Sequence, residues 1–175
     1  MSKLIAGTDH AHHPCIMLLI NLTVLTLSAM FFSKSFGYAV RGILYVMLAS
    51  PERQRIHADE IATALSVPRH FSSKVMKKLV KQGVIDSVRG PHGGFSLNGK
   101  TAATTLFDIV KISGDDQQFT SCALRLKNCN SLHPCPLHYK ISPARQSMLQ
   151  LLQATTMQDL LHPEQENFLK SLSVA

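Results

Sequence analysis

The sequence of 175 residues predicts a mainly α-helical fold with one small β-hairpin and a long helix near the C-terminus. Three observations lead to this prediction. Apolar residues recur at helical spacing in three segments between residues 36 and 83, a glycine-rich turn then separates two short apolar stretches, and another helical stripe follows residue 143. Hydrophobic residues make up 45% of the chain and charged residues 17%, a composition that permits a packed core and argues against disorder.

Three helices are expected first. Residues 36–49 form an amphipathic pattern that ends near Pro51. Residues 56–83 contain two further helices separated by a short turn, in which Pro68 fixes the start of the second helix and Gly83 caps its end. The inward-facing residues of these two helices are expected to be Ile61, Ala62, Leu65, Phe71, Val75, Met76 and Leu79.

A hairpin follows the helices. Val84, Ile85 and Val88 predict a short strand, and the alternation of Phe95 and Leu97 predicts its partner across a turn-rich tip of sequence RGPHGG. Three helices and a two-stranded hairpin make a winged helix-turn-helix, whose recognition helix lies in the major groove of DNA while the wing touches the backbone or minor groove. We therefore expect residues 30–100 to form a DNA-binding domain.

The charge of the chain is concentrated in this domain. The net charge is +7, and between Arg69 and Lys100 seven lysines and arginines stand against Asp86 alone. Such a basic block indicates a polyanion, with nucleic acid ahead of an anionic membrane, although charge alone is equally typical of a solvated helix face. The residues expected to contact double-stranded DNA are Arg69, Ser73, Lys74, Lys77, Lys78, Arg89 and His92.

Residues 101–161 are expected to hold a cysteine-rich loop and dimerisation helices. A short helix at residues 105–114 ends at Gly114, and Pro143 opens a long helix with an apolar stripe of Ala144, Met148, Leu151 and Leu152. Thr156 and Asp159 match a capping box in which Asp replaces the usual Glu. The long helix either packs on its own domain or pairs with a second copy, and we favour a homodimer because symmetric DNA-binding proteins read two half-sites.

The cysteine-rich loop carries the candidate metal ligands Cys122, Cys129, Cys135 and His138, with His133 as a competitor for the fourth position. Thiolates bind zinc, cuprous copper and iron–sulfur clusters. A closed structural zinc site and a redox-active iron–sulfur cluster both agree with the spacing, and a metal-free thiol switch is a third alternative.

One stretch of the sequence matches an enzymatic motif, but its context argues against that function. Residues 94–101 match the phosphate-loop pattern G-x-x-x-x-G-K-[ST], but they follow a turn instead of a buried strand, and their interior alternates like a strand. No Ser-His-Asp or paired-carboxylate arrangement is evident either. We therefore expect neither an enzyme nor a small-molecule substrate.

Residues 16–32 form an uncharged apolar run at the short limit for a membrane span, which is also compatible with a signal peptide. We favour a third reading, in which translation starts at Met30 and residues 1–29 are a mis-assigned start or leader outside the fold. The expected location is then cytoplasmic with no membrane partner, and residues 162–175 form a C-terminal tail.

Taken together, the stretches SFGYAVRGILYVML and SVRGPHGGFSL and the three downstream cysteines resemble the bacterial Rrf-type winged-helix regulators of the IscR and NsrR kind. The resemblance covers about residues 30–161. It implies a cytoplasmic, homodimeric transcription factor, by default a repressor, whose long C-terminal helices cross at the dimer interface. It also implies a [2Fe–2S] or [4Fe–4S] cluster on Cys122, Cys129 and Cys135, with a nearby histidine such as His138 as the fourth ligand in some relatives and a carboxylate of the partner chain in others.

The resulting hypothesis is a transcriptional regulator whose operator affinity is controlled by an iron–sulfur cluster that senses redox state, nitric oxide or iron–sulfur supply. The alternative is a zinc-stabilised winged-helix interaction module without a sensing role.

Overall fold

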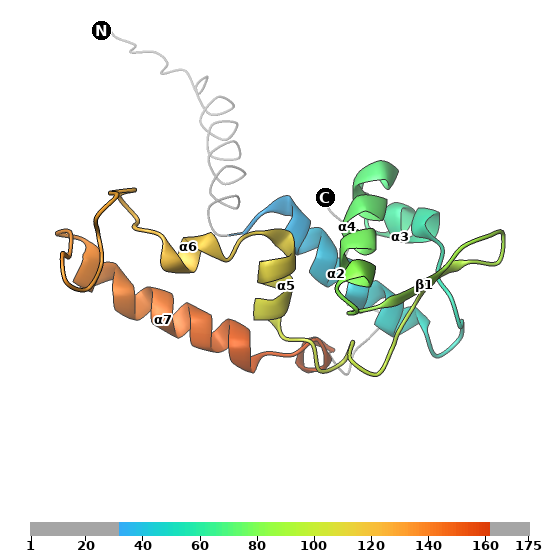
Figure 1. Ribbon diagram of the computed structural model, residues 1–175. Helices are drawn as coiled ribbons and strands as arrows, with labels where there is room; N and C mark the ends of the chain where they lie inside the picture. The colour runs from blue at the N-terminus through green and yellow to red at the C-terminus, as the bar shows by residue number, and fades with distance from the viewer. Residues whose placement is uncertain (1–31, 162–175) are drawn as a thin grey trace, which may run out of the picture. The chain divides into compact units, whose positions relative to one another are not determined.

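The computed structural model describes residues 32–161, and Figure 1 shows their arrangement. The prediction for residues 1–29 lies outside this described part. Three helices come first, α2 (Lys34–Ala49), α3 (Ala58–Ala64) and α4 (Arg69–Lys81). Ser33 is the N-cap of α2, and its hydroxyl accepts a hydrogen bond from the backbone N–H of Phe36 at 3.2 Å. Within residues 32–161, no helix is long and apolar enough to cross a membrane.

Helices α3 and α4 form the expected helix-turn-helix. Ser66 in the turn has a positive φ of 52°, and Pro68 is the N-cap of α4. Ile61 of α3 and its C-cap residue Leu65 lie in the core with Met76 and Leu79 of α4, and all four are at most 1% exposed. This packing sets the angle between the two helices and turns the polar face of α4 outward.

A small wing follows, in which strands β1 (Asp86–Val88) and β2 (Gly94–Ser96) pair antiparallel, with Ser87 opposite Phe95. The prediction that the first strand includes Val84 and Ile85 is wrong: both are buried in the core before pairing begins at Asp86. Their apolar character therefore reflects burial rather than a place in the strand. Two backbone hydrogen bonds between Ile56 and Phe95, of 2.8 and 2.9 Å, fix the wing to the segment before α3.

Residues 94–101, which match the phosphate-loop pattern, belong to the second strand of the wing and the turn that follows it. Gly94 to Ser96 form β2, and the hydroxyl of buried Thr101 donates a 2.7 Å hydrogen bond to the carbonyl oxygen of Val84. A hydroxyl used in this way does not serve a bound magnesium ion. Residues 94–101 therefore form a strand and the turn after it, and not the strand-to-helix loop of a phosphate site.

Helix α5 (Leu106–Ser113) confirms the predicted short helix. Thr105 and Asp108 form a reciprocal capping box at its start, and Gly114 ends it with φ of 86° in the left-handed region. A one-turn helix, α6 (Gln117–Thr120), leads into residues 121–137, which we call the cysteine loop.

The long helix α7 (His138–Ala154) begins five residues earlier than predicted. Pro143 lies inside the helix and does not open it. Proline removes one backbone donor and would leave the carbonyl of Tyr139 without its helical partner, but Tyr139 is 67% exposed, so water can reach that region. One residue earlier, the Ser142 hydroxyl donates a 2.6 Å hydrogen bond to the carbonyl oxygen of His138.

The end of α7 is attached to the winged domain. Met157 is fully buried in the main core, and its backbone N–H donates to the carbonyl oxygen of Thr104 at 2.9 Å. Thr156 and Asp159 make the predicted capping contacts around the final turn η1 (Gln158–Leu160). Figure 1 shows α7 running from the cysteine loop to this attachment beside α5.

Candidate nucleic-acid interface and metal centre

The outer face of α4 is uniformly basic. Ser72, Val75, Met76 and Leu79 point into the core, so the lysines of this amphipathic helix are left on the opposite face, and the helix contains no acidic residue. An open depression on this face is lined by His70, Ser73, Lys74, Lys77, Lys78 and Lys81. The structure thus brings together four of the five predicted contact residues of the helix, all but Arg69. It adds His70 and Lys81, of which Lys81 continues the lysine spacing.

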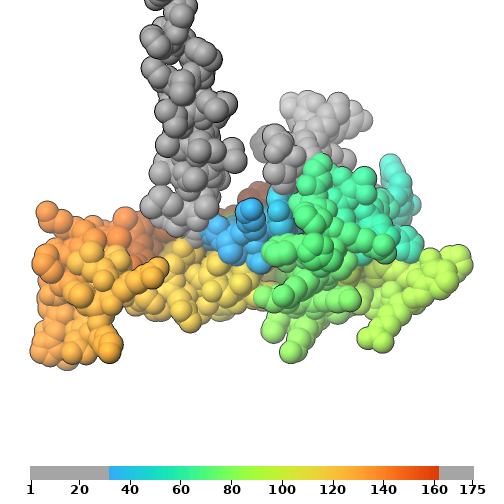
Figure 2. All heavy atoms as spheres, turned by 90° about the horizontal axis from the view of Figure 1, so that it is seen from above, coloured from blue at the N-terminus to red at the C-terminus, as the bar shows by residue number. Residues whose placement is uncertain are grey.

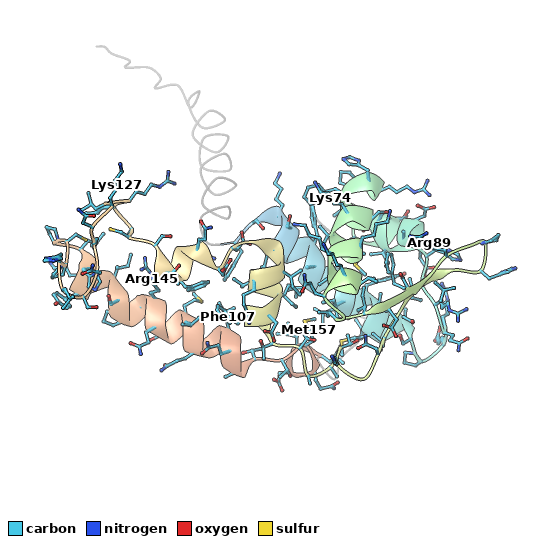
Figure 3. The ribbon with its side chains drawn as sticks, in the orientation of Figure 1. Lys74, Arg89, Phe107, Lys127, Arg145 and Met157 are labelled. Carbon is cyan, nitrogen blue, oxygen red and sulfur yellow. The ribbon has the colours of Figure 1, made fainter. Side chains whose placement is uncertain are left out.

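The wing extends this basic surface. Arg89 and His92 are exposed near its tip, and a cleft between α4 and the wing is lined by both Lys77 and Arg89, together with His57 at the start of α3. Figure 3 shows Lys74 on α4 and Arg89 on the wing within the same winged domain. His57 is not among the residues predicted from the sequence to contact DNA, because its position beside the wing depends on the backbone pairing of Ile56 with Phe95.

Arg69 differs from the other predicted contacts because it forms an ion pair with Asp59 of α3. Its side chain nevertheless remains 74% exposed and that of Asp59 57%. Exposed pairs of this kind stabilise a protein by about 0–1 kcal/mol, so a competing phosphate can displace the carboxylate at little cost.

The three cysteines of the cysteine loop converge. The sulfur atoms of Cys122, Cys129 and Cys135 all lie within 4.8 Å of one another, and those of Cys122 and Cys135 are 4.0 Å apart. Cys135 is buried and the other two are half-buried. A 2.9 Å hydrogen bond from the N–H of Arg125 to the carbonyl oxygen of Cys122 closes a turn at the start of the loop.

The environment shifts the pKa of two of these thiols in opposite directions. The backbone N–H groups of Leu126 and Leu124 hold the pKa of Cys122 below its usual value. A hydrogen bond from the backbone N–H of Cys135 acts in the same sense on Cys129. Desolvation and the neighbouring thiols of Cys122 and Cys135 outweigh that effect, so the pKa of Cys129 is raised.

His138 lies at the first position of α7, with its Nδ1 atom 3.5 Å from the sulfur of Cys129. Its competitor His133 is exposed, and the turn around it is closed instead by backbone bonds to the side chain of Asn130. Only His138, of the two histidines, has a ring nitrogen beside a cysteine sulfur in the described contacts.

This donor set fits a soft or borderline metal. Bonds of 2.3 Å from sulfur to a tetrahedral ion place the sulfurs about 3.8 Å apart, close to the separation of Cys122 and Cys135. A polynuclear iron–sulfur centre, in which thiolates bind different iron atoms, needs wider spacing. The position of the loop outside the main core leaves room for such opening.

Similarity to known proteins is informative about both the basic surface and the candidate metal centre. A protein-family model described as Rrf2, iron-dependent transcriptional regulator, matches residues 32–163. A protein of Aquifex aeolicus (strain VF5), assigned provisionally by its name to the HTH-type transcriptional regulators, is 34% identical over 79% of this chain and 96% of its own length. The HTH-type transcriptional regulator NsrR of Geobacillus kaustophilus (strain HTA426) is 30% identical over 71% of this chain and 84% of its own length.

Solved structures share the architecture. CymR (YrzC), the global cysteine regulator of B. subtilis, superposes with a TM-score of 0.60 at 20% identity, covering 74% of this chain and 94% of that one. IscR of T. potens gives a TM-score of 0.56 at 19% identity, covering 77% and 88%. These structures confirm the winged-helix fold. Since the family model spans the whole described part of the chain and the relatives are regulators, not enzymes, the chain belongs to the Rrf2 family of DNA-binding transcriptional regulators.

Proposed function

We propose that this regulator binds operator DNA with an affinity set by a metal centre on Cys122, Cys129 and Cys135, with His138 as the fourth ligand. The observation that carries the proposal is the convergence of three cysteine sulfurs within 4.8 Å at the start of α7. The family description, iron-dependent transcriptional regulator, supports iron as the metal. An iron–sulfur cluster held there would supply a redox-active and chemically labile group able to report on oxidants, nitric oxide or iron–sulfur supply.

The DNA contacts follow from the basic surface. Ser73, Lys74, Lys77 and Lys78 would enter the major groove from α4, while Arg89 and His92 would reach the backbone or minor groove from the wing. Phosphate contacts from lysine and arginine would supply most of the affinity and make it salt-dependent. Arg69 would contribute after leaving Asp59.

Helix α7 provides the physical connection between the two sites. Its first residue, His138, touches Cys129, and the segment after its last residue is fixed to the winged domain by Met157 and by a 2.9 Å hydrogen bond from the N–H of Leu106 to the carbonyl of Thr155. A change in the conformation of the cysteine loop would therefore shift the start of α7 directly. If α7 also pairs with a second copy, its tilt sets the spacing of two recognition helices and hence operator affinity.

The first test is the iron, sulfide and zinc content of the full chain purified without oxygen, together with its visible spectrum and its DNA binding before and after iron removal. Iron and sulfide in comparable amounts, with a change in DNA affinity on their loss, are expected. A metal centre whose removal leaves DNA affinity unchanged would contradict the sensing role and leave the DNA-binding role standing.

One observation favours a second candidate, a structural zinc site. The 4.0 Å separation of the Cys122 and Cys135 sulfurs is close to that required by a single tetrahedral ion, and His138 would complete a Cys₃His set. The same measurement separates the two, because a zinc protein is colourless, holds one zinc per chain and loses its folded loop on chelation.

A further inference from the structure

The cysteine loop and α7 carry only positive charge. No aspartate or glutamate occurs between Asp116 and Asp159, whereas the same stretch contains the cations Arg125, Lys127, Lys140 and Arg145. Two of these, Arg125 and Lys127, lie in the loop itself, between Cys122 and Cys129. The DNA-contact surface predicted from the sequence ended at the wing and did not include them.

The loop cations are exposed and uncompensated. Arg125 and Lys127 both face solvent, and neither is among the ion pairs formed by residues 32–161. The turn of the chain at Arg125, where φ is 55°, and the 2.9 Å bond from its N–H to Cys122 give this part of the loop a defined path. Figure 3 shows Lys127 at the outer tip of the loop, pointing away from α7.

The loop shares a side of the described structure with the proposed recognition helix. In Figure 3 the labelled Lys74 and Lys127 both lie along the upper side, and Figure 2, which looks onto that side, shows α4 and the cysteine loop exposed there. Helix α7, with 17 residues, separates the loop from the winged domain by about 25 Å at 1.5 Å per residue. That length corresponds to roughly seven base pairs of duplex DNA.

We propose that Arg125 and Lys127 form a second DNA-contact surface, which binds phosphates of the duplex flanking the site read by α4 and the wing. An acidic protein would satisfy the same charges, but duplex DNA is favoured because the loop lies on the same side as α4, at a separation that DNA bound there can span. Because the two cations lie between two of the proposed metal ligands, their placement depends on the state of the metal centre. This inference rests on the proposed metal-dependent DNA binding and specifies how part of that dependence arises.

The test uses the full chain, loaded with its metal and handled without oxygen. A duplex is first selected by the wild-type protein from a random-sequence library, then prepared in a minimal form and in a form with ten additional base pairs on each side. Affinity for both duplexes is measured by fluorescence anisotropy from low to high salt. The variants are Lys127→Gln, the double variant Arg125→Gln/Lys127→Gln, and the control Lys111→Gln, which removes one positive charge from an existing ion pair with Asp108 on α5.

The wild-type protein is expected to show a steeper dependence of log K on log salt with the long duplex than with the minimal one. Each lost phosphate contact lowers the slope by about 0.9, so the double variant should lower it by roughly 1.8 per protomer, with the long duplex alone affected. Lys111→Gln should leave the difference between the duplexes intact, and the iron and sulfide content should be the same in all variants.

Equal slopes for the wild type and the double variant on the long duplex would overturn the proposal while leaving DNA binding through α4 in place. No salt-dependent DNA binding by the wild type at all would overturn the proposed function as well. If the double variant binds DNA normally but loses affinity for poly-glutamate used as a model acidic partner, the loop is a protein-docking surface and the DNA assignment is wrong.

Discussion

The neighbouring residues Leu151 and Leu152 test the expected pairing of α7 with a second copy. Leu151 is 56% exposed in the described chain, whereas Leu152 is 2% exposed and packed against its own domain. Burying a whole leucine side chain contributes about 1.5–3 kcal/mol, so covering the exposed part of Leu151 contributes roughly 0.8–1.7 kcal/mol per chain. Two copies contribute about twice that, which corresponds to a roughly 15- to 250-fold change in the dimer dissociation constant.

The assay is sedimentation equilibrium over a range of protein concentrations, combined with urea denaturation. Leu151→Ala should raise the dimer dissociation constant by that factor and change the stability of the separated chain little. Leu152→Ala should lower the free energy of unfolding by about 2–5 kcal/mol, as expected for a core leucine. A dimer constant that is the same for the wild type and Leu151→Ala would refute the reasoning that this face of α7 is covered by a partner.

Four further outcomes are expected. Lys74→Ala should weaken DNA binding at low salt and flatten the salt slope by about one, measured by anisotropy titrations. Cys129→Ala should abolish visible absorbance while far-UV circular dichroism stays the same, because the loop lies outside the main core. Gly94→Ala should reduce both stability and DNA affinity, since φ is 145° and a Cβ atom would lie 2.7 Å from the carbonyl oxygen of Ile56. The pKa of Asp108 is lowered by Lys111 and by Thr105, so the contribution of this carboxylate to stability is present above about pH 4 and is lost as pH falls further. Asp108→Asn should therefore reduce the fall in the free energy of unfolding below about pH 4, measured by urea denaturation at a series of pH values.

Local signals in the sequence determined most of the winged domain. Helical periodicity predicted α2 and α5, and Gly114 marked the end of α5, because a left-handed glycine acts within one turn of the chain. The N-caps Ser33 and Thr105 were not predicted, and α2 begins at Lys34, two residues before the predicted start. The ligand types of the candidate metal centre and the basic face of α4 were also visible, since both depend on residue identity and spacing alone.

The incorrect predictions came from sequence patterns that are compatible with more than one structure. Pro143 is typical of a helix start, but the exposed first turns of α7 tolerate it in the interior, so the helix begins at His138. Val84 and Ile85 satisfy a strand pattern, yet burial in the core accounts for them equally well. The predicted apolar stripe of α7 divides between buried Leu152 and exposed Leu151, and only the packing of the helix on α5 decides which is which.

The sequence by itself determined which side chains are candidates for binding metal and DNA, because charge and ligand type belong to the side chain. Tertiary structure alone decided how far apart they lie. Cys122 and Cys135 are thirteen positions apart and yet 4.0 Å from sulfur to sulfur, because turns fold the loop back on itself. Thr104 and Met157 are far apart in the sequence but in contact in the structure. Burial of the Met157 side chain and the hydrogen bond between the two backbones outweigh the chain entropy that is lost when the segment between them is closed. That closure is what joins the cysteine loop, through α7, to the DNA-binding domain.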